Sequence, residues 1–342
     1  MCGIAGIVSG KKLNIQYLKH LCDGIAHRGP DDEGFFIKDT SNNYYSLKGA
    51  ASPMSLDLRN IAEFTNLEIQ HGFSHRRFSI IDTSSSGHQP MVDTRQHNLA
   101  ISFNGEIYNF IEIREELEAM GVTDFKSNSD TEVILKAYKK WGVSCFSKFN
   151  GFWAIAIYDN DKLILSRDRI GKKPLYYSDD GGYFIFCSEI NPIIDLRKRL
   201  NLNVCLEDKA IFDYLALDRR NTEFDTLFKE IKQVEPASIF TLNLNTLSHE
   251  SKPFWELKQK FDEKFDFEYY SRKFRETLSE AVSLRLRSDV PLEANLSGGL
   301  DSSAIVALAS KDPIFANKQL VTHTFRYVGD KSLDESKSAK LI

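Results

Sequence analysis

The chain has 342 residues, of which 42% are hydrophobic and 27% charged, and its formal net charge is −4. This composition is typical of a folded protein of about two domains and excludes an intrinsically disordered chain. A slightly acidic chain also lacks the global positive field that favours nucleic acid or an anionic membrane, so neither is expected as a partner.

The cysteines indicate reduced thiols. Their number is odd, and no zinc-like spacing occurs among Cys2, Cys22, Cys145, Cys187 and Cys205. We therefore expect no disulfide framework and no metal site, and reduced thiols favour the cytoplasm. No apolar run reaches about 18 residues, so no membrane span is expected.

The first 200 residues predict many strands and few helices. Residues 3–8 form an apolar run typical of a buried strand, and residues 14–29 have helical spacing until HRGPDDEG predicts a charged loop. This pattern indicates layered sheets covered by helices rather than a βαβ repeat. Further strands are predicted at 68–82, 99–109, 151–159, 162–168 and 181–189, and helices at 111–120 and 129–142.

The pattern changes in the last third of the chain. Residues 267–288 carry apolar side chains four apart and predict a long amphipathic helix. A strand at 291–296, a Gly-rich turn, a helix at 304–310 and a strand at 320–328 follow. This order is typical of the start of a parallel α/β sheet. We expect one domain at 1–205, and a linker with an incomplete second domain at 206–342.

Cys2 is the first candidate catalytic residue. Removal of Met1 would leave a thiol and a free α-amine on one residue, and an amine with a pKa near ~7.7 can accept the thiol proton. The alternative is that Cys2 is a small buried hydrophobic residue.

Three further motifs supply what a thiol nucleophile needs. Asn104 and Gly105 offer N–H donors for an oxyanion, although NG between apolar residues also predicts a hairpin turn. One of the two arginines in HRRFSIID could hold a substrate carboxylate. Asp130 could accept an ammonium group, or simply lie at a helix N-terminus. Together these groups describe a site for an amino acid with a side-chain amide, and glutamine fits.

The sequence LSGGLDSS, residues 296–303, is the second candidate site. It lies between a predicted strand and a predicted helix, where backbone N–H groups and Ser hydroxyls can receive a phosphate. It lacks the Gly-Lys-Ser/Thr ending of the usual NTPase loop. A plain Ser/Gly turn is the alternative.

In these motifs the chain resembles the glutamine-dependent asparagine synthetases, in which a class II (N-terminal nucleophile) amidotransferase is fused to an ATP-pyrophosphatase domain. The resemblance implies an α+β Ntn-hydrolase domain, a four-layer αββα sandwich, followed by an incomplete parallel α/β domain like that of the adenine nucleotide α-hydrolases. The matching motifs, in family order, are MCGIAG, HRGPDDEG, HRRFSIID, FNGEIYN, SDTEVIL, NGFWAIAIYD, RDRIGKKPLYY, SEI and SDVP with LSGGLDSS.

The resemblance also implies residue roles. Cys2 would be the glutaminase nucleophile, and Asn104 with Gly105 would form the oxyanion hole. In the second domain Leu296 and Tyr327 would flank the adenine. The glutamine site would contain Arg77, Ser79, Ile80, Glu106 and Asp130, and the phosphate site Ser297, Gly298, Gly299, Asp301, Ser302 and Ser303.

The implied reaction makes asparagine. ATP, accompanied by Mg²⁺, would adenylylate the side-chain carboxylate of aspartate, and ammonia released from glutamine would displace AMP through an internal route. Two residues depart from the family pattern, Glu293 before the phosphate loop and Lys172 in RDRIGKKPLYY. Neither change removes a reacting group.

The chain ends at DESKSAKLI, in a segment that predicts a helix without a stop signal. We therefore expect a C-terminally truncated member whose glutaminase half is complete. It would act as a homodimer or pair with a chain that supplies the missing half. The alternatives are a stand-alone glutaminase that delivers ammonia to another acceptor, for example a sugar acid, and an inactive remnant.

Overall fold

The computed structural model describes residues 1–342 except 94, 97, 220–223, 260–265, 316–318, 328 and 330–333. The chain divides into two units, Met1–Leu257 and Lys258–Ile342, which are described separately. None of the helices in the described part of the chain is long and apolar enough to cross a membrane.

Two antiparallel sheets form the centre of the first unit. Over the described residues, the first sheet has the order β11-β9-β10-β1-β4-β2-β3 and the second has the order β13-β12-β8-β7-β6-β5. The strands of the first sheet are β1 (Gly3–Asn14), β2 (Asp32–Asp39), β3 (Tyr44–Lys48), β4 (Glu68–Arg77), β9 (Tyr176–Asp180), β10 (Tyr183–Cys187) and β11 (Lys232–Gln233). Those of the second sheet are β5 (Met91–Val92), β6 (Leu99–Ile107), β7 (Gly151–Asp159), β8 (Lys162–Arg167), β12 (Ser238–Asn243) and β13 (His249–Pro253).

The two sheets pack face to face, and helices cover their outer faces. In β1, Ile4 and Val8 belong to the core between the sheets, whereas Ala5 and Ile7 belong to the core under the helices. This alternation follows from the two-residue period of a strand. The helices of this unit are α1 (Gln16–Gly24), α2 (Phe110–Ala119), α3 (Asp130–Trp141), α4 (Ile190–Arg199) and α5 (Asp208–Leu217).

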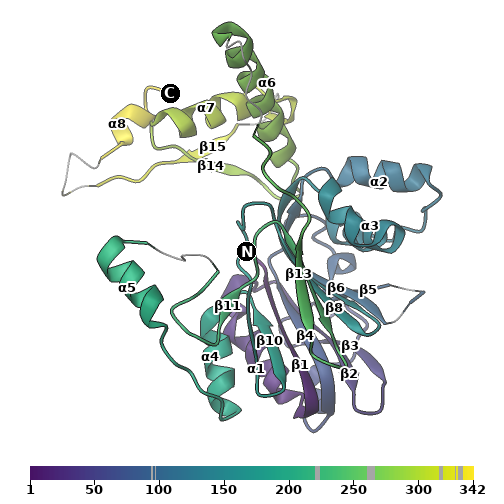
Figure 1. The fold of residues 1–342 in the computed structure, drawn as a ribbon. Helices are drawn as coiled ribbons and strands as arrows, with labels where there is room; N and C mark the ends of the chain where they lie inside the picture. The colour runs from purple at the N-terminus through teal and green to yellow at the C-terminus, as the bar shows by residue number, and fades with distance from the viewer. Residues whose placement is uncertain are drawn as a thin grey trace. The chain divides into compact units, whose positions relative to one another are not determined.

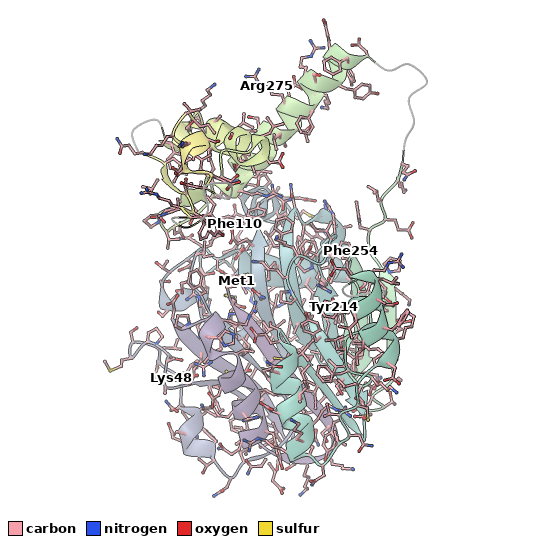
Figure 2. The ribbon with its side chains drawn as sticks, turned by 90° about the vertical axis from the view of Figure 1, so that its left-hand side faces the viewer. Met1, Lys48, Phe110, Tyr214, Phe254 and Arg275 are labelled. Carbon is pink, nitrogen blue, oxygen red and sulfur yellow. The ribbon has the colours of Figure 1, made fainter. Side chains whose placement is uncertain are left out.

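Separate cores lie beneath the two helix pairs. Leu18 of α1 and Ile193 of α4 pack on the first sheet, and Leu117 of α2 and Val133 of α3 pack on the second. Figure 1 shows α1 next to α4 and α2 next to α3, and side chains fill the space between the layers (Figure 2). The predicted four-layer αββα sandwich is therefore confirmed.

The predicted strands and helices of the first unit are present, but the charged loop predicted at HRGPDDEG, residues 27–34, ends earlier than expected. Asp32–Asp39 is the strand β2, which pairs with β3 and β4. The two charged residues at its start are buried and have partners: Asp32 Oδ2 contacts His88 Nδ1 at 2.7 Å, and Glu33 pairs with Arg76. The charged residues therefore led to the prediction of a loop where an interior strand of the sheet begins.

The strands β11, β12 and β13 complete both sheets. β11 pairs with β9 in the first sheet, and β12 pairs with β8 in the second. The structural division therefore falls after Leu257, later than the boundary expected after Cys205.

The second unit contains a short parallel strand pair and its helices. β14 (Glu293–Asn295) pairs with β15 (Val321–His323), and α7 (Leu300–Ala309) connects them, as predicted. The other helices of this unit are α6 (Phe267–Arg285) and α8 (Ser336–Ala339).

Candidate active site

Cys2 lies directly before β1 and is held by the segment that follows β4. The backbone N–H of Phe78 donates to Cys2 Sγ at 3.3 Å, and the thiol contacts the Phe78 carbonyl at 3.5 Å. Arg28 Nε donates to the Cys2 carbonyl oxygen at 3.0 Å. The backbone and side chain of Cys2 are therefore both fixed before any substrate binds.

The surroundings of the Cys2 thiol have opposing effects on its pKa. Burial raises the pKa of the Cys2 thiol, while the Phe78 N–H and the positive charges of the N-terminus, Arg77 and Lys173 oppose that rise. Burial also lowers the pKa of the α-amine of Met1. A thiol in this position needs a nearby base to form the nucleophilic thiolate.

Asn104 and Gly105 lie near the end of β6. The Asn104 side chain is only 1% exposed, and neither its Oδ1 nor its Nδ2 has a hydrogen-bond partner among the described residues. Leaving a buried polar group unpaired costs about 1–3 kcal/mol. Because the Asn104 amide lies in the wall of a pocket and has no partner among the described residues, it can form hydrogen bonds with a ligand.

Replacing Gly105 with alanine is expected to destabilise the fold by about 1–3 kcal/mol and to lower activity, because the added Cβ would overpack two strands. That Cβ would lie 2.1 Å from the carbonyl oxygen of Phe152 in β7. Chemical denaturation and steady-state kinetics would measure the two effects. The matched control is Gly10→Ala, where nothing lies within 4 Å of the new Cβ. Equal behaviour of the two variants would contradict this account.

Two acidic side chains form another part of the site. Asp130 begins α3, after the N-cap Ser129, and its Oδ2 accepts the N–H of Ile107 at 3.1 Å. Burial raises the pKa of Asp130 to about 7, and the nearby Glu106 adds to the rise. Burial also raises the pKa of Glu106. A substrate ammonium would favour the ionised form of these carboxyls.

Replacing Asp130 with asparagine is expected to flatten the pH dependence of stability between about pH 4 and pH 7. With a pKa raised from 3.8 to about 7, the folded chain binds a proton that the unfolded chain releases. The free energy of unfolding of the unaltered chain therefore falls as pH rises through this window. Urea denaturation across the window, compared between the two proteins, measures the effect. An equal slope in both would contradict the prediction.

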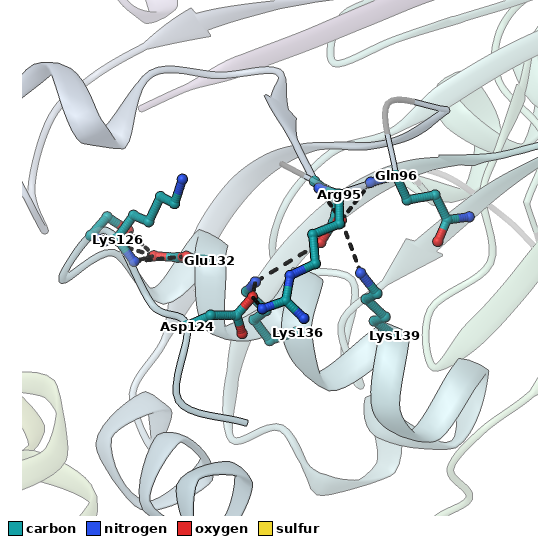
Figure 3. A network of polar contacts seen from close by, with 9 residues as sticks. Arg95, Gln96, Asp124, Lys126, Glu132, Lys136 and Lys139 are labelled. Carbon is teal, nitrogen blue, oxygen red and sulfur yellow. Dashed lines mark hydrogen bonds and ion pairs between the residues drawn. The ribbon is translucent and has the colours of Figure 1, made fainter. Parts of the chain in front are cut away.

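A polar network anchors α3. The Glu132 carboxylate accepts the N–H of Ser127 at 2.7 Å and that of Lys126 at 3.0 Å. Further along the helix, Lys136 pairs with Asp124 and Lys139 pairs with Asp93, each through its Nζ (Figure 3). These contacts fix the helix that presents Asp130.

Of the two predicted glutamine-site residues Arg77 and Ser79, only Arg77 lines the pocket. Arg77 lines the pocket, and its guanidinium donates to the carbonyl of Ser84 at 2.9 Å and to that of Asp82. The backbone N–H of Ser79 instead donates to Asp31 Oδ2 at 2.8 Å, and Ser79 is not among the residues that line the pocket.

One pocket of about 120 Å³ collects most of the glutamine-site residues predicted from the sequence. Its lining also includes residues to which no role was assigned from the sequence, although all of them except Gln89 lie within the motifs quoted above. The predicted residues in its lining are Cys2, Arg77, Ile80, Asn104, Gly105, Glu106 and Asp130, and the others are Met1, Phe78, Ile81, Gln89, Phe103, Ser129, Thr131 and Lys173.

The Gly-rich loop of the second unit connects β14 to α7. Gly298 has a φ of +79°, a conformation that favours glycine. Ser297 Oγ and Ser302 Oγ are 2.9 Å apart, and Ser303 Oγ donates to the Gly299 carbonyl at 2.6 Å. Among the described residues no set of three or more His, Cys, Asp or Glu side chains is arranged to hold a metal ion.

The two residues predicted to flank an adenine follow the two strands of the second unit. The backbone N–H of Leu296 donates to the carbonyl of His323 at 2.8 Å, and Leu296 is buried. Tyr327 lies beyond the end of β15 and is exposed. The position of Asp301 in the first turn of α7 completes the predicted loop.

A solved structure shares this fold. Glutamine phosphoribosylpyrophosphate amidotransferase from B. subtilis aligns with 96% of this chain and 67% of its own, with a TM-score of 0.53 and 19% identity. The fold is therefore that of the Ntn-hydrolase-like amidotransferases.

Comparisons of sequence identify the family. The model of the glutamine amidotransferase domain matches residues 62–255, more than half of the chain, and the asparagine synthase model matches residues 273–342. The chain belongs to the glutamine amidotransferase family, and its last part corresponds to the start of an asparagine synthase domain.

Curated relatives carry both parts. A putative glutamine-hydrolysing asparagine synthetase 2 of Methanocaldococcus jannaschii is 33% identical over 100% of this chain and 62% of its own length. Asparagine synthetase 3 of Bacillus subtilis is 32% identical over 91% of this chain and 45% of its own. The chain thus spans less than two thirds of the length of these relatives.

Proposed function

We propose that the chain hydrolyses glutamine to glutamate and ammonia, with Cys2 as the nucleophile. The observation that carries this proposal is the shared pocket of Cys2, Asn104 and Asp130, which come from three distant parts of the sequence. A thiol, a buried unpaired amide and an acidic group are the parts that attack on the side-chain amide of an amino acid requires.

Removal of Met1 prepares the nucleophile. It leaves the α-amine on Cys2, beside the thiol, and an α-amine with an ordinary pKa of ~7.7 is partly unprotonated at neutral pH, so it can accept the thiol proton. The thiolate attacks the amide carbon of glutamine, and the carbonyl oxygen becomes an oxyanion. Asn104 Nδ2 and the Gly105 N–H donate to that oxygen.

Collapse of this intermediate breaks the carbon–nitrogen bond. The protonated amine of Cys2 gives its proton to the leaving nitrogen, ammonia departs, and a thioester to Cys2 remains. Water, which gives a proton to the now neutral amine of Cys2, then attacks the thioester carbon. The carbon–sulfur bond breaks, glutamate is released, and the proton from water passes to the Cys2 sulfur.

The remaining groups hold the substrate. Arg77 receives the α-carboxylate, and Asp130 with Glu106 receives the α-ammonium group. Ile80 contacts the aliphatic part of glutamine. Ser79 contributes from outside the pocket lining, through the segment that its N–H bond to Asp31 fixes.

The second unit is proposed to serve an ATP-dependent synthetase reaction. Its strand, Gly-rich loop and helix fit a phosphate group, because Gly298 adopts a positive φ and Ser hydroxyls lie at the N-terminus of α7. ATP with Mg²⁺ would supply an adenylyl group that activates the aspartate carboxylate. The chain's own groups would hold the phosphates (Ser297, Gly298, Gly299, Asp301, Ser302 and Ser303) and the adenine (Leu296 and Tyr327).

The two halves of the proposal need separate assays. Equal release of glutamate and ammonia from glutamine tests the glutaminase half, and its absence in a chain shown to lack Met1 would contradict it. Release of pyrophosphate that requires both ATP and aspartate tests the synthetase half. Hydrolysis without pyrophosphate release would instead support delivery of ammonia to another acceptor or partner chain.

A further inference from the structure

The side-chain amide of Gln89 joins two walls of the candidate site. Its Oε1 accepts the backbone N–H of Phe103 at 2.7 Å, and its Nε2 donates to Oγ1 of Thr131 at 3.1 Å. Because a backbone N–H can only donate, the Oε1 must face Phe103, which turns the NH₂ group towards Thr131. The orientation of this amide is therefore determined by its partners.

The two partners adjoin the residues proposed to act on glutamine. Phe103 precedes Asn104 in β6, and Thr131 follows Asp130 in α3. Gln89 is 5% exposed and lines the same pocket. It thus connects the strand of the oxyanion donors to the helix that presents the ammonium acceptor.

The backbone beneath Gln89 is anchored to the other sheet. A Cβ placed on Gly34 of β2 would lie 2.2 Å from the carbonyl oxygen of Gln89, which shows how closely the two backbones pack. The preceding residue, His88, contacts Asp32 of β2 through Nδ1 and Oδ2, 2.7 Å apart. Cys2 is held against this same sheet. Gln89 therefore connects the sheet that carries Cys2 to the strand of the oxyanion donors and to the helix that presents Asp130.

A second contact also joins β6 to α3, the bond from the Ile107 N–H to Asp130 Oδ2. That bond uses the carboxylate that the substrate ammonium would share. The two hydrogen bonds of Gln89 use neither the carboxylate of Asp130 nor the side-chain amide of Asn104. They fix the spacing of the two groups without competing with substrate.

We propose that Gln89 is a positioning residue for glutamine hydrolysis, which sets the separation between the Asn104–Gly105 oxyanion donors and Asp130. This inference rests on the proposed glutaminase function. The amide carbonyl and the α-ammonium group of glutamine are joined by a short side chain, so the site must receive both groups at once. Misplacement by about 1 Å can cost a reaction about 100-fold.

The test compares Gln89→Leu and Thr131→Val with the unaltered full chain. Gln89→Leu removes both bonds and is expected to lower kcat for glutamine hydrolysis about 10- to 100-fold. Thr131→Val removes one bond and should have a smaller effect. The double variant should be little worse than Gln89→Leu, because its two changes act on one connection.

A matched control separates positioning from general stability. Gln233 is also buried, and its Oε1 accepts from Arg167 NH1 at 3.1 Å, outside the pocket. Gln233→Leu should lower the melting temperature while leaving kcat within about twofold of the unaltered chain. If Gln89→Leu changes kcat no more than Gln233→Leu does, the positioning role is wrong.

Gln89→Glu gives a pH-dependent rescue. A protonated carboxyl can still accept from Phe103 and donate to Thr131, whereas a carboxylate cannot donate. The activity of Gln89→Glu relative to the unaltered chain should therefore rise as pH falls, while the ratio for Gln89→Leu stays flat. Flat ratios for both variants would overturn the proposal. Absence of hydrolysis in the unaltered chain would instead contradict the glutaminase function itself, and the positioning role with it.

Discussion

Replacing Cys2 with alanine is expected to lower the rate of glutamine hydrolysis by about 10⁴-fold or more. The reason is that no other cysteine lines the pocket: Cys22, Cys145 and Cys187 are buried elsewhere, and Cys205 is exposed. The oxyanion donors alone cannot replace a covalent nucleophile. Glutamate release per mole of enzyme, with glutamine in excess, measures the loss.

The control for this variant is Cys205→Ala, which removes an exposed thiol and should leave the rate unchanged. Circular dichroism should show that both variants fold. A Cys2→Ala protein that keeps more than about a tenth of the activity would exclude Cys2 as the nucleophile.

Replacing Asn104 with alanine is expected to lower kcat by about 10²–10³-fold while leaving stability nearly unchanged. The Asn104 amide has no partner among the described residues, so its removal breaks no hydrogen bond of the resting fold. Removing a buried unpaired amide also relieves the cost of its desolvation. Steady-state kinetics and chemical denaturation together measure the two effects.

Asn243 is the matched control because its side chain has the opposite role. Asn243 Oδ1 accepts the N–H groups of Asn245 and Thr246 at 2.9 and 3.0 Å in a turn. Asn243→Ala should lower stability and leave kcat unchanged. If Asn104→Ala behaves like Asn243→Ala, the oxyanion role is contradicted.

The sequence predicted the layered architecture because most strands alternate or run apolar between turn residues. The start of strand β2 was not predicted, because Asp32 and Glu33 are typical of loops. In the folded chain they are buried, since His88 and Arg76 pair with them. Those partners are distant in sequence, and no local sequence pattern predicts the pairing. The later division of the chain has a similar cause, because β11 and β12 join sheets whose other strands lie far upstream.

The candidate site was predictable where short motifs carry its chemistry. Cys2, Asn104 and Asp130 were each singled out by residue type and position, and the structure brings them to one pocket. Gln89 was missed, because a glutamine in a loop has no distinguishing pattern. Lys173 lies in the motif RDRIGKKPLYY, but no role was assigned to it from the sequence. Only the folded chain brings Gln89 within hydrogen-bond distance of Phe103 and Thr131.

The role of Cys2 as the nucleophile is tested most directly by covalent labelling with an electrophilic analogue of glutamine, followed by intact mass and peptide mapping. We expect a protein without Met1 that carries one adduct on Cys2, formed more slowly when glutamine competes. Labelling at another residue, labelling indifferent to glutamine, or a retained Met1 on an active enzyme would contradict it.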